Sequence, residues 1–183
     1  MSLILGILDS GGAAASTSSY ESIASITVSG GTTHTFSTIS SDYTHLQLRF
    51  NLIMGSGADA IFVRFNSDTG SNYSRHGLYG TGDTASAVGS ANTTTMYAYG
   101  FFNGVIQTYP NVGIVDILDY TSTTKNKTLR TFSGADNNSL GGGGNVSIGS
   151  GLWRNTNAIT SITLSSGSTF NSGTISLYGI KGA

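Results

Sequence analysis

Apolar and polar side chains alternate along much of this chain with a period of two residues. The longest such stretch is residues 44–54, where mostly polar residues separate five apolar ones: Leu46, Leu48, Phe50, Leu52 and Met54. This period is typical of a β-strand that turns one face inward and the other outward. The sequence therefore predicts its clearest strand here.

The alternation returns at Ile61, Val63 and Phe65, after a Gly-Ser-Gly sequence at residues 55–57. A short glycine-rich turn between two alternating stretches predicts a hairpin that pairs them. Further segments rich in β-forming residues, bounded by Gly, Ser, Asn or Asp, are also predicted strands: 22–28, 34–38, 93–102, 112–120, 127–133, 146–153, 159–164 and 174–180. The chain is thus expected to be all-β, with about ten strands.

The segment 112–120 differs because apolar residues occupy both of its alternating sets. This pattern predicts a central strand that is covered on both sides. Asp116 and Asp119 interrupt the run, and buried carboxylates need hydrogen-bonding partners. Arg130 and Lys127 are candidates for that pairing, and a catalytic role for the two carboxylates is the alternative.

The composition favours a surface that is polar without being charged. Charged residues are only 9% of the 183 residues, while glycine occurs 26 times and proline once. Serine and threonine must therefore coat the outward strand faces. We expect one antiparallel β-sandwich domain over residues 20–183, with a jelly-roll-like path.

The charge and cysteine content limit the partners of this domain. A net charge of −1 with eight Lys and Arg leaves no basic stripe for a phosphate backbone, so we expect no nucleic-acid partner. Without cysteine there is no disulfide and no thiolate ligand. The fold must depend on its core and on neighbouring subunits.

The N-terminal residues 1–19 are expected to form an extended arm. Residues 1–8 are apolar but far short of the ~20 residues that span a bilayer, and no basic leader marks a signal peptide, so we expect no membrane partner. Residues 9–19 are small and polar, as in a tether. We expect the apolar side chains to anchor the arm to a partner protein: Leu3, Ile4, Leu5, Ile7 and Leu8.

One polar loop, residues 66–72, resembles the start of a calcium-binding loop. Asn66, Asp68 and Asn72 offer side-chain oxygens at alternating positions around Gly70, but the closing acidic ligand is missing. The sequence leaves two interpretations open, an Asx-capped turn and a weak cation site. His34, His45 and His76 are isolated, so we expect no metal or other cofactor.

The sequence offers little for catalysis. A glycosidase needs two opposed carboxylates. The candidate pairs are Asp116 with Asp136 and Asp116 with Asp68. No nucleophile elbow or phosphate-binding loop is present in the sequence. We therefore expect no enzymatic activity and no catalytic residue.

Aromatic residues give a second class of candidate contact. Tyr73, Tyr79, Tyr109 and Trp153 could stack on sugar rings, or could fill the core and the seams between subunits. The three tyrosines lie in turn-rich stretches, which makes them candidates for glycan contact.

Several segments, in order from about Tyr20 to the C-terminal residues, resemble a family of tailed-phage virion proteins. The similar segments are 20–24, 43–49, 63–66, 68–74, 116–120, 152–154, 159–164 and 177–182. The resemblance implies a structural protein located at the virion surface. It implies no catalytic residues.

These observations together lead to a functional expectation. We expect a capsid decoration or head-fibre protein, anchored by its N-terminal arm to other virion proteins such as the major capsid protein or an appendage protein. It should be a homo-oligomer, for instance a trimer. The alternative is a tail-fibre or adhesin module that binds host surface carbohydrate, and a polysaccharide depolymerase is the weaker third option.

Overall fold

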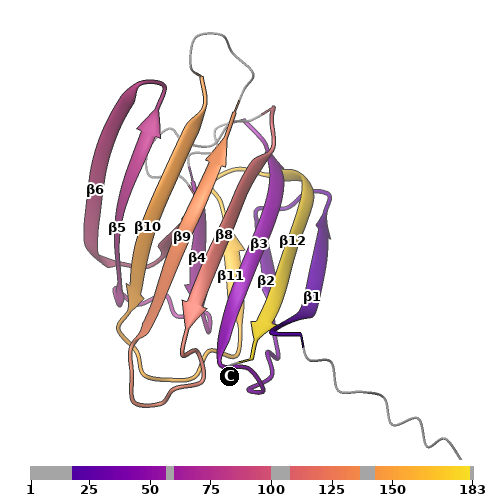
Figure 1. Cartoon of the computed structure of the whole chain (residues 1–183), viewed down its shortest axis with the longest axis vertical. Helices are drawn as coiled ribbons and strands as arrows, with labels where there is room; N and C mark the ends of the chain where they lie inside the picture. The colour runs from indigo at the N-terminus through magenta and orange to yellow at the C-terminus, as the bar shows by residue number, and fades with distance from the viewer. Residues whose placement is uncertain (1–17, 57–59, 100–107, 137–142, 182–183) are drawn as a thin grey trace, which may run out of the picture.

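The computed structural model describes residues 18–56, 60–99, 108–136 and 143–181, which form twelve strands and no helix (Figure 1). The strands are β1 (Tyr20–Val28), β2 (Thr33–Phe36), β3 (His45–Met54), β4 (Ile61–Phe65), β5 (Tyr73–Thr81), β6 (Thr84–Thr93), β7 (Met96–Tyr99), β8 (Asn111–Leu118), β9 (Lys127–Ala135), β10 (Asn145–Trp153), β11 (Ile162–Ser165) and β12 (Phe170–Ile180).

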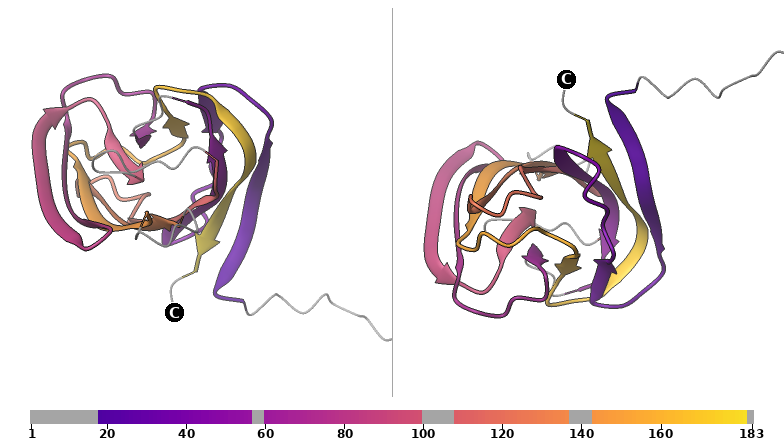
Figure 2. Two further views of the ribbon diagram at one scale, coloured as in Figure 1. Left: turned by 90° about the horizontal axis from the view of Figure 1, so that it is seen from above. Right: turned by 90° about the horizontal axis from the view of Figure 1, so that it is seen from below.

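The strands make two antiparallel sheets that pack face to face (Figure 2). The larger sheet has the order β1-β12-β3-β8-β9-β10-β5-β6, and the smaller has the order β2-β11-β4-β7. The predicted all-β antiparallel sandwich is therefore confirmed. This strand order is compatible with a jelly-roll-like path, which stays a prediction.

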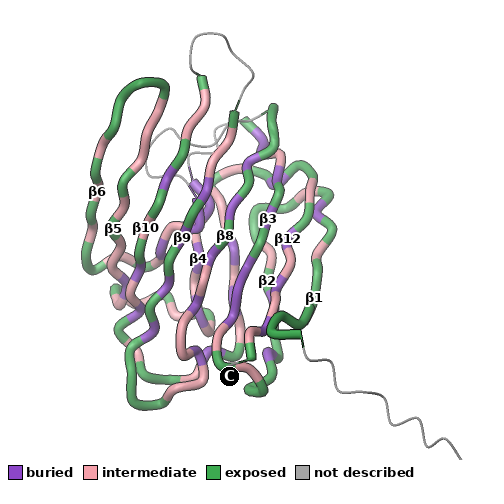
Figure 3. Tube along the Cα trace, viewed as in Figure 1, coloured by how far each residue is buried: buried purple, intermediate pink, exposed green. Residues whose placement is uncertain are grey.

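The core lies between the two sheets and is built by the predicted alternation. Along β3 every second side chain, from Leu46 to Met54, is buried, and the positions between them are less buried with the exception of Gln47. Figure 3 shows the same change between buried and exposed positions along β8, β9 and β10. Since each strand contributes one apolar face, the two sheets together exclude water from a single core.

The prediction that β3 and β4 form a hairpin is wrong. β3 pairs with β12 and β8 in the larger sheet, while β4 pairs with β11 and β7 in the smaller one. The chain therefore crosses from one layer to the other between these strands, and Gly57 of the predicted turn lies outside the described residues. Alternation shows that each strand has an inward face, but it does not show which sheet the strand joins.

β8 is a central strand, as predicted, but only one of its faces is covered. Val115 and Ile117 are fully buried, whereas Val112 and Ile114 remain 46% and 38% exposed on the other face. The expectation of cover on both sides is thus wrong for the single chain. The apolar residues of the other alternating set, Val112 and Ile114, lie instead on the outward face of the larger sheet.

The hairpin of β5 and β6 has no counterpart among the predicted strands. Its outward positions hold small residues such as Gly80, Ala85 and Ala87, which give little apolar periodicity. The predicted strand 93–102 instead corresponds to the shorter β7, and residues 100–102 lie outside the described residues.

The predicted N-terminal arm also lies mostly outside the described residues, including the anchor Leu3, Ile4, Leu5, Ile7 and Leu8. β1 begins at Tyr20, which agrees with the expected start of the sandwich. In the part of the chain that the structure describes, no helix has the length and apolarity needed to cross a bilayer.

Candidate functional site

The outward face of the larger sheet holds a continuous group of apolar side chains that we call the outer apolar block. Strand register places Ile114, Phe132, Ile148 and Leu78 side by side on β8, β9, β10 and β5. The neighbouring row along the same strands is Val112, Gly134, Val146 and Gly80, and the block ends on β6 with Ala87 and Ala85.

None of these ten positions carries a charged or hydrogen-bonding side chain. The six large side chains are exposed to between 38% (Ile114) and 57% (Phe132). A soluble monomer rarely leaves so many adjacent apolar side chains in contact with water, and such patches mark interaction surfaces. The block is therefore the strongest candidate for a functional site in the described residues.

Glycine makes the surface of the block uneven. Three hollows of about 790, 580 and 330 Å³ lie along it, and two of them adjoin Gly80 or Gly134. Phe132 and Ile148 stand as ridges beside these hollows. The block thus presents ridges and hollows of aliphatic size, which suits contact with another protein surface.

A row of polar side chains borders the block on one side. Gln47 donates to the Asp116 carboxylate at 2.7 Å, and the Arg130 guanidinium lies 3.6 Å from the same carboxylate. The predicted pairing of Asp116 with Arg130 is confirmed. Arg49 lies on β3 opposite Ile114, with its guanidinium 4.8 Å from the centre of the Tyr178 ring and its Nε donating to Gln47.

The sequence made Lys127 a candidate partner of Asp119. In the structure Asp119 pairs with Lys125 instead, at 2.7 Å. Lys127 is buried, and its ammonium donates to the backbone carbonyls of Ser122, Lys125 and Thr156 at 2.6–3.0 Å. Burial lowers the pKa of Lys127. Its role is to hold the loop after β8 against the loop after β10.

The loop 66–72 forms the Asx turn that was one of its two interpretations. The Gly70 N–H donates to Asp68 Oδ1 at 2.8 Å, and Asn72 Nδ2 donates to Asp68 Oδ2 at 2.9 Å. Trp153 Nε1 also donates to Asp68 Oδ2, at 2.7 Å. The Asp68 carboxylate is thus occupied by protein donors.

Asn66 faces a different loop. Its Oδ1 accepts from the N–H groups of Thr160 and Ser161, and its Nδ2 donates to the Ala158 carbonyl. The predicted cation ligands Asn66, Asp68 and Asn72 therefore do not converge on one point, and the weak cation site stays a prediction. Among the described residues, no group of three or more His, Asp or Glu side chains is placed so that it could hold a metal ion.

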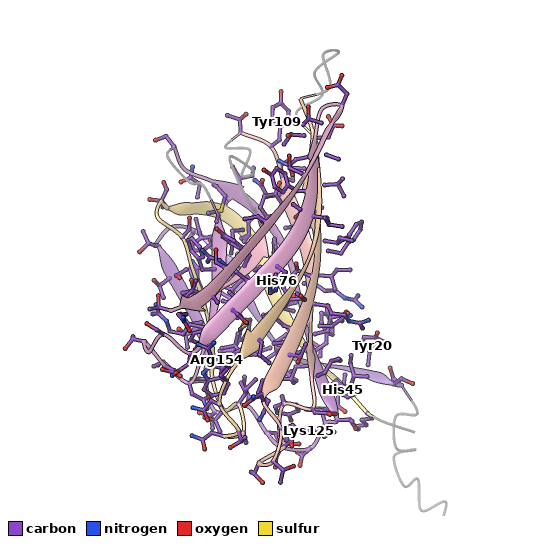
Figure 4. The ribbon with its side chains drawn as sticks, turned by 90° about the vertical axis from the view of Figure 1, so that its left-hand side faces the viewer. Tyr20, His45, His76, Tyr109, Lys125 and Arg154 are labelled. Atoms are coloured by element: carbon purple, nitrogen blue, oxygen red, sulfur yellow. The ribbon has the colours of Figure 1, made fainter. Side chains whose placement is uncertain are left out.

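Two of the four predicted glycan contacts are buried. Tyr73 and Trp153 are 0% and 1% exposed, and their rings stack with centres 6.2 Å apart. A sugar cannot reach them, so this part of the prediction is wrong. Tyr79 is half-buried on β5, and Tyr109 is 39% exposed at the end of the sandwich opposite Lys125 (Figure 4).

The candidate carboxylates for catalysis lie on separate elements. Asp116 is on the outward face of β8, Asp68 is in the loop after β4, and Asp136 follows β9. Burial raises the pKa of Asp68, but hydrogen bonds from Trp153, Asn72 and Gly70 outweigh this effect and leave the pKa below its usual value. A general acid needs the opposite shift.

The lowered pKa of Asp68 predicts a contribution to stability that depends on pH. The carboxylate stabilises the folded chain above its unfolded pKa of about 3.9, and this contribution is lost as the pH falls through the lower folded pKa. Replacing Asp68 by Asn should therefore reduce stability at pH 7 and flatten the decline in unfolding free energy below about pH 4. Urea denaturation across this pH range measures both effects.

Asp119→Asn is the matched control, because its pKa is lowered mainly by the exposed Lys125. Added salt should weaken the Asp119 contribution and leave that of Asp68 largely unchanged, since the donors to Asp68 are neutral. An unchanged pH profile in Asp68→Asn would contradict the assignment.

Comparisons of the chain with protein-family models, with curated proteins and with solved structures give no match.

Sequence reasoning missed the outer apolar block, although part of its signal was present. Ile114 and Val112 lie on the second alternating set of their strand, and Val146 and Ile148 alternate with Ser147 and Gly149. These residues indicate an apolar face only when β8, β9, β10 and β5 are aligned in register, and that alignment comes from the structure.

Proposed function

We propose that this protein is a structural component of a tailed-phage particle, displayed on the virion surface as a capsid decoration or head-fibre protein and held there by its N-terminal arm. The outer apolar block is the observation on which the proposal chiefly depends. An uncharged, uneven face that spans five strands suits a protein that acts by binding other proteins.

The resemblance to tailed-phage virion proteins supports this proposal, and its segments lie together in the fold. Four of them lie on β1, β12, β3 and β8, which are neighbours in the larger sheet. Their residues contact one another, as in the 2.7 Å ion pair of Glu21 with Lys181. The similar residues thus maintain the framework of the sheet.

The remaining similar segments meet at the loop 66–72. Arg154 donates to the Ser71 carbonyl at 2.7 Å, next to the bond from Trp153 to Asp68, and Asn66 binds the loop before β11. These contacts join the two sheets at one end of the sandwich. A framework role of this kind is what a structural family would share.

The adhesin alternative retains one observation in its favour, the exposed ring of Tyr109 at an end of the sandwich. Tyrosine rings at such positions are suited to sugar stacking. Tyr109 is the residue at which this alternative would be tested by glycan binding.

Counting copies of the protein in purified particles tests the proposal. A decoration protein should be present in on the order of hundreds of copies per head, as a symmetric shell requires. A few dozen copies or fewer, located on the tail, would favour the adhesin, and absence from particles would refute both.

Deletion of residues 2–8 should release the protein from particles without changing its unfolding midpoint, because these residues precede the sandwich. Deletion of residues 10–16 is a matched control, since it removes the same length from the tether and keeps the anchor. Equal release by both deletions would contradict the anchoring role.

A further inference from the structure

We propose that two copies of the chain pair through their outer apolar blocks, face to face, around a two-fold axis that runs along the strands between β9 and β10. This inference rests on the proposed function in treating the block as an assembly surface, and it names the partner as a second copy. Because the same face is used twice, the pair closes on itself and gives a dimer, not the trimer suggested as one form of the oligomer.

The register of the sheet supports this axis. Rotation about it places β8 of one copy over β5 of the other, and β9 over β10. In one row of the block, Val112 then faces Gly80 of the second copy, and Val146 faces Gly134. Each valine of this row thus meets a glycine. In the other row Ile114 faces Leu78 and Phe132 faces Ile148, so large apolar side chains lie against one another there.

The strands at the two edges of the contact fit the same arrangement. β3 of one copy lies over β6 of the other, so Arg49 faces Ala87 and Asn51 faces Ala85. Long polar side chains therefore meet small residues. In the bordering polar row, Asp116 faces His76 of the second copy, which pairs a carboxylate with an imidazole.

The contact has the size of a specific interface. Six strands, β3 to β6 across the sheet, spaced about 4.8 Å apart, with three rows of outward side chains about 7 Å apart, cover roughly 600 Å² per copy. A specific interface needs about 500 Å² or more per partner. The centre of this area is apolar and its border is polar, which is the usual arrangement in protein interfaces.

Gly80 provides a sharp probe of the pairing. A Cβ atom at Gly80 would have only ordinary contacts, 3.7 Å from Val146 Cγ1 and 3.8 Å from the Thr84 carbonyl, so a side chain is tolerated within one copy. Gly80→Val should nevertheless raise the dimer dissociation constant by roughly 30-fold or more, because the new side chain meets Val112 of the second copy. Sedimentation velocity of the isolated full chain measures this constant.

A compensating change separates this pairing from a general loss of stability. Val112→Ala combined with Gly80→Val should restore the dissociation constant to within about tenfold of the original, since the projection and the hollow exchange places. Thr174→Val on β12 lies on the same face beyond the contact and should leave the dimer unchanged. Urea unfolding of each variant checks that the single chain stays folded.

A chain that stays monomeric at its highest soluble concentration would overturn the inference. A dimer that Gly80→Val does not weaken would do the same, because another surface would then hold it. If the wild-type chain is monomeric and deletion of residues 2–8 increases binding of a hydrophobic dye, the N-terminal arm covers the block and the inference is wrong. The isolated protein decides this question, whereas the proposed function is decided by the content of particles.

Discussion

Replacing Trp153 by alanine should reduce the unfolding free energy by about 3–5 kcal/mol, a large share of the total stability of a domain of this size. The indole is 1% exposed, stacks on Tyr73 and lies edge-on to Phe65 with ring centres 5.7 Å apart. Its removal leaves a cavity between the sheets and takes a donor from Asp68. Urea denaturation followed by circular dichroism measures the loss.

Trp153→Phe separates the two contributions. Phenylalanine keeps most of the packing against Tyr73 and Phe65, but it cannot donate to Asp68. The Asp68 carboxylate retains two other donors, so we expect this variant to lose only about 1–2 kcal/mol. A loss of less than about 1 kcal/mol in Trp153→Ala would show that the ring does not hold the sheets together.

Gly173→Ala should be destabilising by about 3–5 kcal/mol, although it adds only one methyl group. Gly173 has a φ of +130° in β12, a conformation that is unfavourable for other residues. An added Cβ would lie 2.9 Å from Leu52 Cα and closer still to the Asn51 carbonyl oxygen. Both atoms belong to the backbone of β3, so the clash cannot be relieved by a change of rotamer.

Gly30→Ala is the matched control for this effect. Gly30 has the same φ of +130°, yet nothing lies within 4 Å of its added Cβ. We expect a loss of about 1–2 kcal/mol there from backbone strain alone. The difference between the two variants in thermal denaturation measures the steric part, and equal losses would contradict a close approach of β12 to β3.

The sequence predicted individual strands well, because inward and outward positions alternate in segments such as 44–54 and 174–180. It did not predict β5 and β6, since a hairpin with Gly77, Gly80, Ala85 and Ala87 shows little contrast between its faces. It also assigned β3 and β4 to one hairpin, because alternation does not distinguish two layers.

The same limit explains the errors at the candidate sites. Tyr73 lies in a turn-rich stretch, and both Tyr73 and Trp153 have rings suited to stacking on sugars. The Tyr73 hydroxyl donates instead to the backbone carbonyls of Phe65 and Asp68, while the Trp153 indole donates to the Asp68 carboxylate and stacks on Tyr73. The pairing of Asp116 with Arg130 was predicted because β8 and β9 are neighbours along the chain. Contacts between distant segments, including those that create the outer apolar block, required the sheet register.

The position of β12 between β1 and β3 has a consequence for the order in which the protein acquires its structure. β1 and β3 are made early, but β1 lacks its neighbour in the sheet, and β3 lacks one of its two neighbours, until residues 170–180 have been synthesised. Until then both present unpaired backbone edges that can pair with other chains. Pairing across so long a stretch of sequence makes folding slow, so newly made chains at high concentration are expected to benefit from chaperones.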